Sequence, residues 1–359
     1  MILIGHTFSG FALNTRLQPG ATLISDAIST ASLWEIVRLK MHYSEHMGSH
    51  PPTLSSHGQE SAPRDDAEPE ILPPAPGYGP GYGPGHESGY TAPHSDFGPP
   101  APVRRRPLWA AAPATYLLVG INCVVFLAMV ARGISPMSPS VDQLMNWGAN
   151  NAGNVLIIGE WWRIVTAMFL HVGILHLATN MWCLWNLGLL AEPLMGSWGL
   201  LAAYILTGAA GNLLSTLVNW VWPIHDGGSI VFPAGAGASG AVFGIAGALI
   251  ILLKSKQLPV PRDELKRLRR SVIYFAAINL AIGFSIWGGN MVFRSGLNID
   301  NMAHLGGFAS GLLFAMPLVP RVGSSRTLFQ TRMRLAIAML VGLLVLFGFY
   351  IAHVPPPQG

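Results

Sequence analysis

One hydroxyl group stands at the start of a long apolar run in the stretch PAGAGASGAVFG. It belongs to Ser239, which lies close to the glycines Gly237 and Gly240. The first turn of a helix has unpaired backbone N–H groups and the positive end of the helix dipole, and both stabilise a nearby anion. Ser239 could therefore be a nucleophile with an oxyanion site partly built from its own backbone. Alternatively, it is one more small residue that lets two membrane helices come close.

A nucleophilic serine needs a base, and the motif AHLGG supplies an imidazole in His304. A serine hydroxyl does not lose its proton at neutral pH without such a group. The small residues Ala303, Gly307 and Gly311 allow the backbone of this segment to approach the segment that carries Ser239. The pattern predicts a hydrogen-bonded pair of Ser239 and His304.

Carboxylates are absent from the interior of these apolar segments, with Glu192 and Asp300 falling at segment ends. We therefore expect a dyad of serine and histidine and not a triad. His171, His176 and His304 could in principle converge on zinc. The chain has no HExxH motif, however, and no carboxylate inside these segments to activate a metal-bound water. We expect no metal site.

A second polar motif, HVGILHLATN, lies in another apolar segment. Its His176 and Asn180 are four residues apart and share one face of a helix, whereas His171 points elsewhere or lies in the preceding loop. Two donors on one wall are the arrangement that holds an oxyanion. The alternative is that both side chains only link helices by hydrogen bonds, as polar residues in membranes often do.

The elements that must position these residues are membrane helices. Of the 359 residues, 51% are hydrophobic and only 11% are charged, which is too apolar for an ordinary soluble domain. Uncharged stretches long enough to cross a bilayer predict an all-α polytopic membrane protein with seven spans. The stretches are 111–131, 172–191, 197–219, 238–253, 271–289, 301–320 and 335–352.

Basic residues gather at 104–106, 254–270 and 321–334. All three clusters fall on one side of the predicted membrane, so the positive-inside rule predicts a cytoplasmic N-terminus and an outside C-terminus. The net charge of +4 therefore reflects topology and not a nucleic-acid partner. Both cysteines, Cys123 and Cys183, lie in predicted spans, which argues against a disulfide framework or a zinc ribbon.

Spans two, four and six run from outside to inside in this topology. Their polar groups, His176, Ser239 and His304, come within the first few residues of each span. Because a helix rises 1.5 Å per residue, all three should lie at a similar, shallow depth on the outer side. Three coincident depths make a common site plausible.

Outside the spans, the sequence divides into segments of different composition. Residues 1–47 either contain an amphipathic helix or result from an upstream start, with Met41 or Met47 as the true initiator. Residues 48–106 are rich in Pro and Gly and predict a disordered cytoplasmic tail. The loop at 132–171 is long for a helical membrane domain. In that loop Trp162 and Arg163 suit either an interfacial anchor or a structural role with backbone carbonyls.

These motifs together resemble those of the rhomboid intramembrane serine proteases. The residues that carry the resemblance are GASG at 237–240, the pattern HxxxxHxxxN, the pattern AHxxGxxxG at 303–311, and the pair Trp162 and Arg163. It covers residues 110–320, the six-helix core. By this resemblance residues 107–320 form the catalytic domain. Residues 321–359 add a further C-terminal transmembrane helix, carried by some members, and a short outside tail.

The resemblance also implies roles for the residues. Ser239 is the nucleophile, and His304 is its general base and later acid. The backbone of Ser239 and the side chains of His176 and Asn180 form the oxyanion hole. Supporting roles fall to Gly237, Gly240, His171, Trp162 and Arg163.

Further implications concern substrates and access. Such enzymes cut single-pass membrane proteins in or near their transmembrane segments, need no cofactor, and act in the lipid bilayer, here expected to be a bacterial-type plasma membrane. Phe284 and Trp287 resemble the lateral gate, and residues 291–293 fall in the loop that caps the site. The alternatives are a non-catalytic rhomboid-like scaffold or chaperone that binds client helices, and a transporter. A transporter is disfavoured because we find no inverted repeat.

Overall fold

The computed structural model describes residues 112–357, except residues 227, 257, 259, 294–299 and 320–324. The side chains of residues 226 and 285–293 also lie outside the description. The predictions for residues 1–47, for the tail at 48–106 and for the side chain of Trp287 therefore concern residues beyond the described part.

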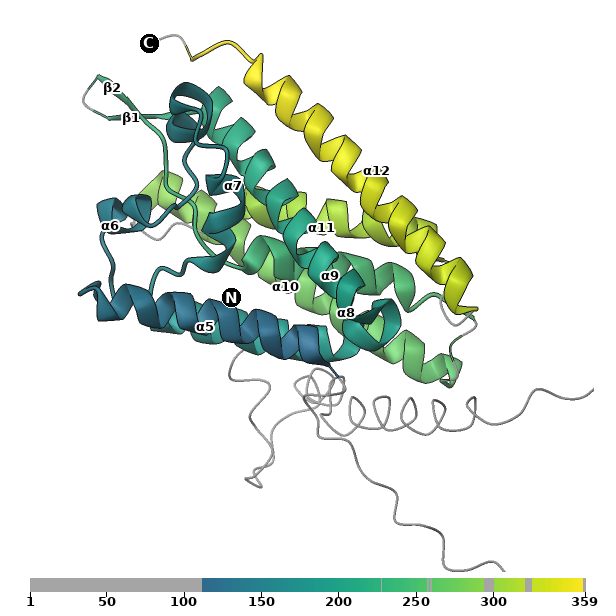
Figure 1. Ribbon diagram of the computed structural model, residues 1–359. Helices are drawn as coiled ribbons and strands as arrows, with labels where there is room; N and C mark the ends of the chain where they lie inside the picture. Colours follow the sequence, from purple (N-terminus) through teal and green to yellow (C-terminus); the bar gives the residue numbers. More distant parts are fainter. Residues whose placement is uncertain are drawn as a thin grey trace, which may run out of the picture. The chain divides into compact units, whose positions relative to one another are not determined.

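The described chain is almost entirely helical, with one small hairpin (Figure 1). The longer helices are α5 (Pro113–Ala131), α8 (Ile174–Val221), α9 (Ser239–Leu252), α10 (Arg262–Phe293), α11 (Asn301–Ala315) and α12 (Arg326–Ala352). The connection between α5 and α8 holds α6 (Val141–Asn146), a π-helical turn (Asn154–Ile158), α7 (Arg163–Thr166) and a 3-10 turn (Ala167–Phe169). A last 3-10 turn, Met316–Leu318, follows α11.

The predicted all-α membrane architecture is confirmed in its main feature, because a helix occupies each stretch that the sequence marks as a span. Among the described helices, α5, α8 and α12 are long and apolar enough to cross a membrane. The strands β1 (Ile224–Asp226) and β2 (Ser229–Val231) form an antiparallel hairpin between α8 and α9, which the prediction missed.

The range of α8 holds two helices that meet at a kink at non-helical Gly196 (φ 77°), which lies between the second and third predicted spans, so their separation is confirmed. Two other predicted boundaries are wrong. The helix α10 starts well before the predicted residue 271 and continues through Phe293, so residues 291–293 end a helix and do not form a loop. The helix α11 ends at Ala315, short of residue 320, and a 3-10 turn follows it.

The centre of the fold is α9, which is buried at nearly every residue. A helix that is apolar on all sides is stable only when it is surrounded, and α8, α10 and α11 pack against it. The contact with α11 is close enough that a Cβ at Gly307 would overlap the carbonyl oxygen of Gly240. The same holds for Gly311 and the carbonyl of Gly244. The small residues therefore bring the two backbones together, as predicted.

A buried carboxylate, Glu192, fixes the start of α5 against α8. It accepts the backbone N–H groups of Ala114 and Thr115 at 2.9 and 2.8 Å, and the Thr115 hydroxyl at 2.7 Å. These N–H groups belong to the first turn of α5 and have no partner within the helix. Glu192 thus satisfies the helix end and holds two long helices together.

Candidate active site

The structure brings Ser239 and His304 into direct contact. Ser239 begins α9 and His304 lies in the first turns of α11. The Ser239 Oγ and the His304 Nε2 are 2.8 Å apart, and the two residues are only 8% and 5% exposed. A hydroxyl and an imidazole at this distance can exchange a proton.

The imidazole of His304 is held from one side by an aromatic ring. Phe243, one turn after Ser239 on α9, stacks on it with ring centroids 4.5 Å apart and an interplanar angle of 18°. Because both Phe243 and Ser239 belong to α9, that helix supplies both the hydroxyl and the surface against which the imidazole rests. The sequence analysis missed Phe243, although its spacing of four residues from Ser239 places it on the same helix face.

The other ring nitrogen of His304 shows whether a carboxylate completes a catalytic triad. Its Nδ1 is buried and has no hydrogen-bond partner among the described residues. If Nε2 accepts the Ser239 proton, Nδ1 must carry the hydrogen of the neutral ring. The nearest carboxylate in sequence, Asp300, accepts hydrogen bonds from Ser215 and Ala303 instead. The described geometry is therefore that of a pair and not of a triad.

His176 lies beside the serine, across Gly237. A Cβ built on Gly237 would fall 2.7 Å from His176 Cε1 and 3.7 Å from Ser239 Oγ. Gly237 also has φ 136°, a backbone conformation that favours glycine. The Nδ1 of His176 accepts the backbone N–H of Val172 in a long bond of 3.4 Å, which favours the tautomer with hydrogen on Nε2. The imidazole then offers an N–H donor next to Ser239.

Asn180 lies one turn after His176 on α8 and is fully buried. Its Nδ2 donates to the backbone carbonyl of His176 at 2.9 Å. This bond occupies one of its two amide N–H groups and leaves the other for a ligand. Its Oδ1 has no partner among the described residues. The two predicted oxyanion donors therefore lie on the same face of α8, but one of the two amide N–H groups of Asn180 already bonds within that helix.

His171 precedes α8, as one of the two predicted options had it. Its ring is fully buried, with its centroid 5.3 Å from that of His176. Burial, together with the neighbouring His176, lowers the pKa of His171 to about 3. The ring is therefore neutral at physiological pH and adds no charge beside His176.

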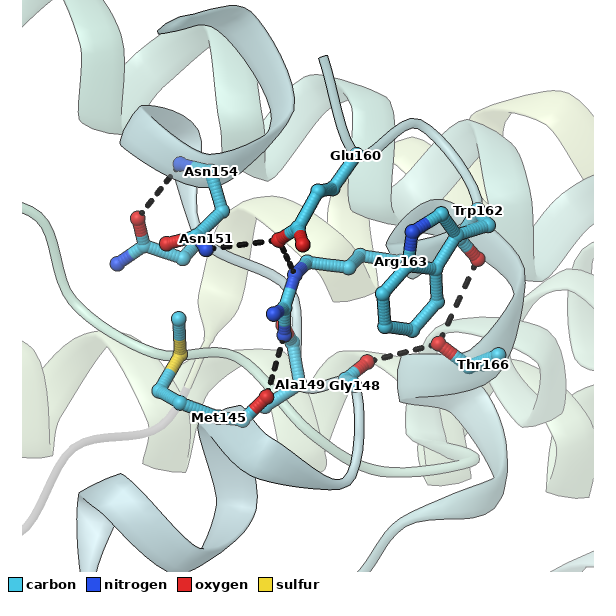
Figure 2. A network of polar contacts seen from close by, with 9 residues as sticks. All are labelled: Met145, Gly148, Ala149, Asn151, Asn154, Glu160, Trp162, Arg163 and Thr166. Atoms are coloured by element: carbon cyan, nitrogen blue, oxygen red, sulfur yellow. Dashed lines mark hydrogen bonds and ion pairs between the residues drawn. The ribbon is translucent and has the colours of Figure 1, made fainter. Parts of the chain in front are cut away.

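Arg163 organises the loop between α5 and α8 (Figure 2). Its guanidinium donates to the carbonyls of Met145 at 2.6 Å and Ala149 at 3.0 Å, and to the Glu160 carboxylate at 2.6 Å. It also lies 4.7 Å from the ring centre of Trp162. Of the two options left open by the sequence, these contacts match binding to backbone carbonyls.

The Glu160 carboxylate completes this loop network. It accepts hydrogen bonds from Asn154 Nδ2 at 2.8 Å and from Arg163 Nε at 2.6 Å. Those two hydrogen bonds hold the pKa of Glu160 below its ordinary value. Nothing in this network touches Ser239, so its part is to shape the loop.

Within the part of the chain that the structure describes, no three histidine, cysteine or acidic side chains lie close enough together to hold a metal ion. The rings of His171 and His176 are neighbours, with centroids 5.3 Å apart, whereas the Nε2 of His304 bonds the Ser239 hydroxyl.

Comparison with known proteins shows which family has this sequence pattern. Residues 158–321 match the family model of the Rhomboid domain. The chain is 31% identical over 245 residues to the rhomboid protease GluP of Bacillus subtilis, across 68% of this chain and 41% of that protein. The chain belongs to the rhomboid family. Rhomboid protease AarA of Providencia stuartii is 29% identical over 217 residues, across 57% of this chain and 72% of AarA.

A plant relative extends the comparison. RHOMBOID-like protein 1 of Arabidopsis thaliana is 33% identical over 189 residues, across 52% of this rhomboid chain and 42% of that protein. The chain thus spans less than half the length of this relative and of GluP. The Rhomboid match, residues 158–321, includes Ser239, His304, His176 and Asn180.

Proposed function

We propose that this protein is an intramembrane serine protease in which Ser239 is the nucleophile and His304 the base. The observation that carries the proposal is the 2.8 Å contact between Ser239 Oγ and His304 Nε2 at the start of a buried apolar helix. The relatives named rhomboid proteases support the same reaction class. Membership of the family alone does not require catalysis, so the contact is the stronger argument.

Acylation follows from the positions of the two side chains. Ser239 Oγ attacks the carbonyl carbon of the scissile peptide bond as its proton passes to His304 Nε2. The tetrahedral oxyanion that forms is stabilised by the backbone N–H of Ser239, by His176 Nε2–H and by the second N–H of Asn180. When the C–N bond breaks, the imidazolium of His304 returns the proton to the leaving amine.

Deacylation repeats these steps with water. His304 Nε2 removes a proton from the water that attacks the acyl carbonyl, and the same donors hold the second oxyanion. The ester bond to Ser239 Oγ then breaks, and the proton returns to Oγ. No step requires a metal or an organic cofactor.

The substrates we propose are single-pass membrane proteins, cut in or near their transmembrane segments. The site lies among apolar helices, so a substrate must arrive from the bilayer or from its edge. We place the N-terminus in the cytoplasm and the C-terminus outside, in a bacterial-type plasma membrane, with α12 as an additional span. The basic clusters of the sequence support this orientation.

A fluorescent fluorophosphonate tests the proposal, because an activated serine displaces fluoride from the probe and becomes labelled. The full-length protein in detergent should be labelled, and Ser239→Ala and His304→Ala should both abolish labelling. Ser310→Ala is a matched control: it removes a buried hydroxyl from α11 that, among the described residues, bonds the Gly307 carbonyl. It should label like the wild type.

Cleavage of a single-pass substrate with a helix rich in Gly and Ala provides the second readout, and it should follow the labelling. The competing function is a scaffold or chaperone that binds client helices without cutting them. Folded wild-type protein that is neither labelled nor active, alongside a positive-control serine protease that is labelled, would favour that alternative. Labelling that persists in Ser239→Ala would also contradict the proposed nucleophile.

A further inference from the structure

The carboxylate of Asp300 joins two helices at the point where α11 begins. Its Oδ1 accepts the backbone N–H of Ala303 at 2.9 Å and thereby caps α11. Its Oδ2 accepts the hydroxyl of Ser215 on α8 at 2.6 Å. The backbone carbonyl of Asp300 accepts the N–H of His304 at 3.2 Å. One residue therefore links the helix of the proposed base to a neighbouring helix.

The segment that leads to Ser239 passes the same carboxylate. A Cβ built on Gly235 would lie 3.1 Å from Asp300 Oδ2. Gly235 exchanges two backbone hydrogen bonds with Asn150, of 2.7 and 2.8 Å, which pin this segment to the loop between α5 and α8. Asp300 thus lies where α8, α11 and the approach to α9 meet.

The packing of α11 explains why such a junction matters. At Gly307 and Gly311 the helix rests directly on the backbone of α9, at Gly240 and Gly244. Close backbone contacts of this kind set the distance between two helices. At those two positions α11 has no side chain that could pack into a groove of α9 and so fix the register along the helix axis. A polar bond at the helix end can supply that register.

We propose that Asp300 is a positioning residue for the dyad: its carboxylate sets the register of α11 against α8 and α9, and so keeps His304 Nε2 within reach of Ser239 Oγ. The inference rests on the proposed function only for its kinetic consequence. The role is geometric, because the carboxylate bonds Ser215 and Ala303 and does not contact His304 Nδ1, which has no described partner.

The kinetic test compares Asp300→Ala, Asp300→Asn and Ser215→Ala in the full-length protein. A misplacement of about 1 Å in an active site can lower the rate about 100-fold. Asp300→Ala should lower kcat about 10- to 100-fold with little change in KM, because the register and not substrate binding is lost. Asp300→Asn should recover most of this loss, because an amide can still bond both Ala303 N–H and Ser215 Oγ. Ser215→Ala, which leaves the cap intact, should give an intermediate loss.

Ser140→Ala is the matched control for the loss of a helix cap. Ser140 caps α6 with its side chain, in the connection between α5 and α8, and contacts neither member of the dyad. It should keep the wild-type kcat. The proposal is overturned if Asp300→Ala keeps the wild-type kcat, or if Ser140→Ala loses as much.

A measurement that needs no turnover separates this inference from the proposed function. In protein with ¹⁵N-labelled histidine, the His304 Nε2 resonance, assigned with His304→Ala, should shift when Ser239→Ala removes its hydrogen bond. Asp300→Ala should reproduce that shift while Ser239 is still present, and Asp300→Asn should not. If the wild type fails to cleave but these shifts occur, Asp300 positions the pair and only the protease function is wrong. An unshifted resonance in Asp300→Ala contradicts the positioning role, whatever the activity.

Discussion

The ring of Phe243 stacks on the imidazole of His304, with centroids 4.5 Å apart and planes 18° from parallel. During the proposed reaction this imidazole becomes a cation between two proton transfers. A desolvated cation over an aromatic face is stabilised by up to about 2 kcal/mol. The stack therefore both orients the ring and favours its charged form.

Replacing this ring should slow the chemical step. Phe243→Leu should lower kcat about 5- to 30-fold, the equivalent of about 1–2 kcal/mol, with KM nearly unchanged. Steady-state cleavage by the purified protein measures both constants. Phe275→Leu is the matched control, because Phe275 is a buried ring that packs against Phe243, with centroids 5.9 Å apart. Equal losses in both variants would show a general packing effect and contradict a specific role for the stack.

The amide of Asn180 offers a second test of the site. If its free N–H binds the oxyanion, Asn180→Ala should lower kcat about 100- to 1,000-fold, the usual cost of one oxyanion donor. Asn186→Ala provides the control. Asn186 lies on the same helix and bonds the carbonyl four residues earlier at 2.8 Å, as Asn180 does. Only Asn180→Ala should impair turnover. Wild-type kcat in Asn180→Ala would remove this residue from the oxyanion hole.

Because α9 and α11 pack closely, alanine should destabilise the protein at some glycines and not at others. Gly307→Ala should greatly lower the melting temperature or prevent folding, because its Cβ would overlap the carbonyl oxygen of Gly240. Gly342→Ala on α12 meets nothing within 4 Å. It should leave the melting temperature unchanged or raise it slightly, since alanine favours a helix over glycine by about 1 kcal/mol. Thermal unfolding in detergent distinguishes the two, and similar stability of both variants would contradict the packing described.

The Glu160 network predicts a pH dependence. Because the folded-state pKa of Glu160 is held below its ordinary value of 4.5, chiefly by Asn154 and then by Arg163, the ionised carboxylate stabilises the fold. This contribution is present above pH 4.5 and is lost as the pH falls through the lower folded-state pKa. The wild type should therefore melt above Glu160→Gln at neutral pH, and the difference should shrink below pH 4.5.

An exposed ion pair serves as the comparison. Asp263 pairs with Lys266 at 3.1 Å, but both side chains are largely exposed, at 88% and 67%. Such surface pairs add little to stability, so Asp263→Asn should have the same melting temperature as the wild type. A difference between wild type and Glu160→Gln that stays constant from neutral to acid pH would contradict the linkage argument.

Much of this arrangement could be predicted because membrane helices can be recognised in a sequence by their length and hydropathy. The contact of Ser239 with His304 could be anticipated from the small residues that allow α9 and α11 to approach. Contacts between residues far apart in the sequence were harder to predict, because they depend on how the helices pack. Nothing in the sequence alone shows that the cap Asp300 also bonds Ser215, 85 residues away, or that Phe243 faces the imidazole.

The hairpin was missed for a different reason. The sequence IHDGGSIV contains a glycine turn between β-branched residues, a recognised hairpin pattern. Its strands are only three residues long, and the apolar segments on either side dominate the hydropathy pattern. The helix ends at 293 and 315 were missed because the span ends were placed by apolarity, which does not mark where the helical hydrogen bonds stop.

Under the proposed function, the length of α9 has a consequence for where a substrate is cut. Its 14 residues reach about 21 Å, which is ~9 Å less than a typical hydrocarbon core of about 30 Å. The exposed Lys254 follows its far end. If Lys254 lies at one surface of the bilayer and α9 runs along the bilayer normal, Ser239 lies about 9 Å beneath the opposite surface. In the proposed reaction, this depth would help to select the bond that is cut by its distance below the lipid headgroups, so a thinner or thicker bilayer should move the cleavage point along the same substrate.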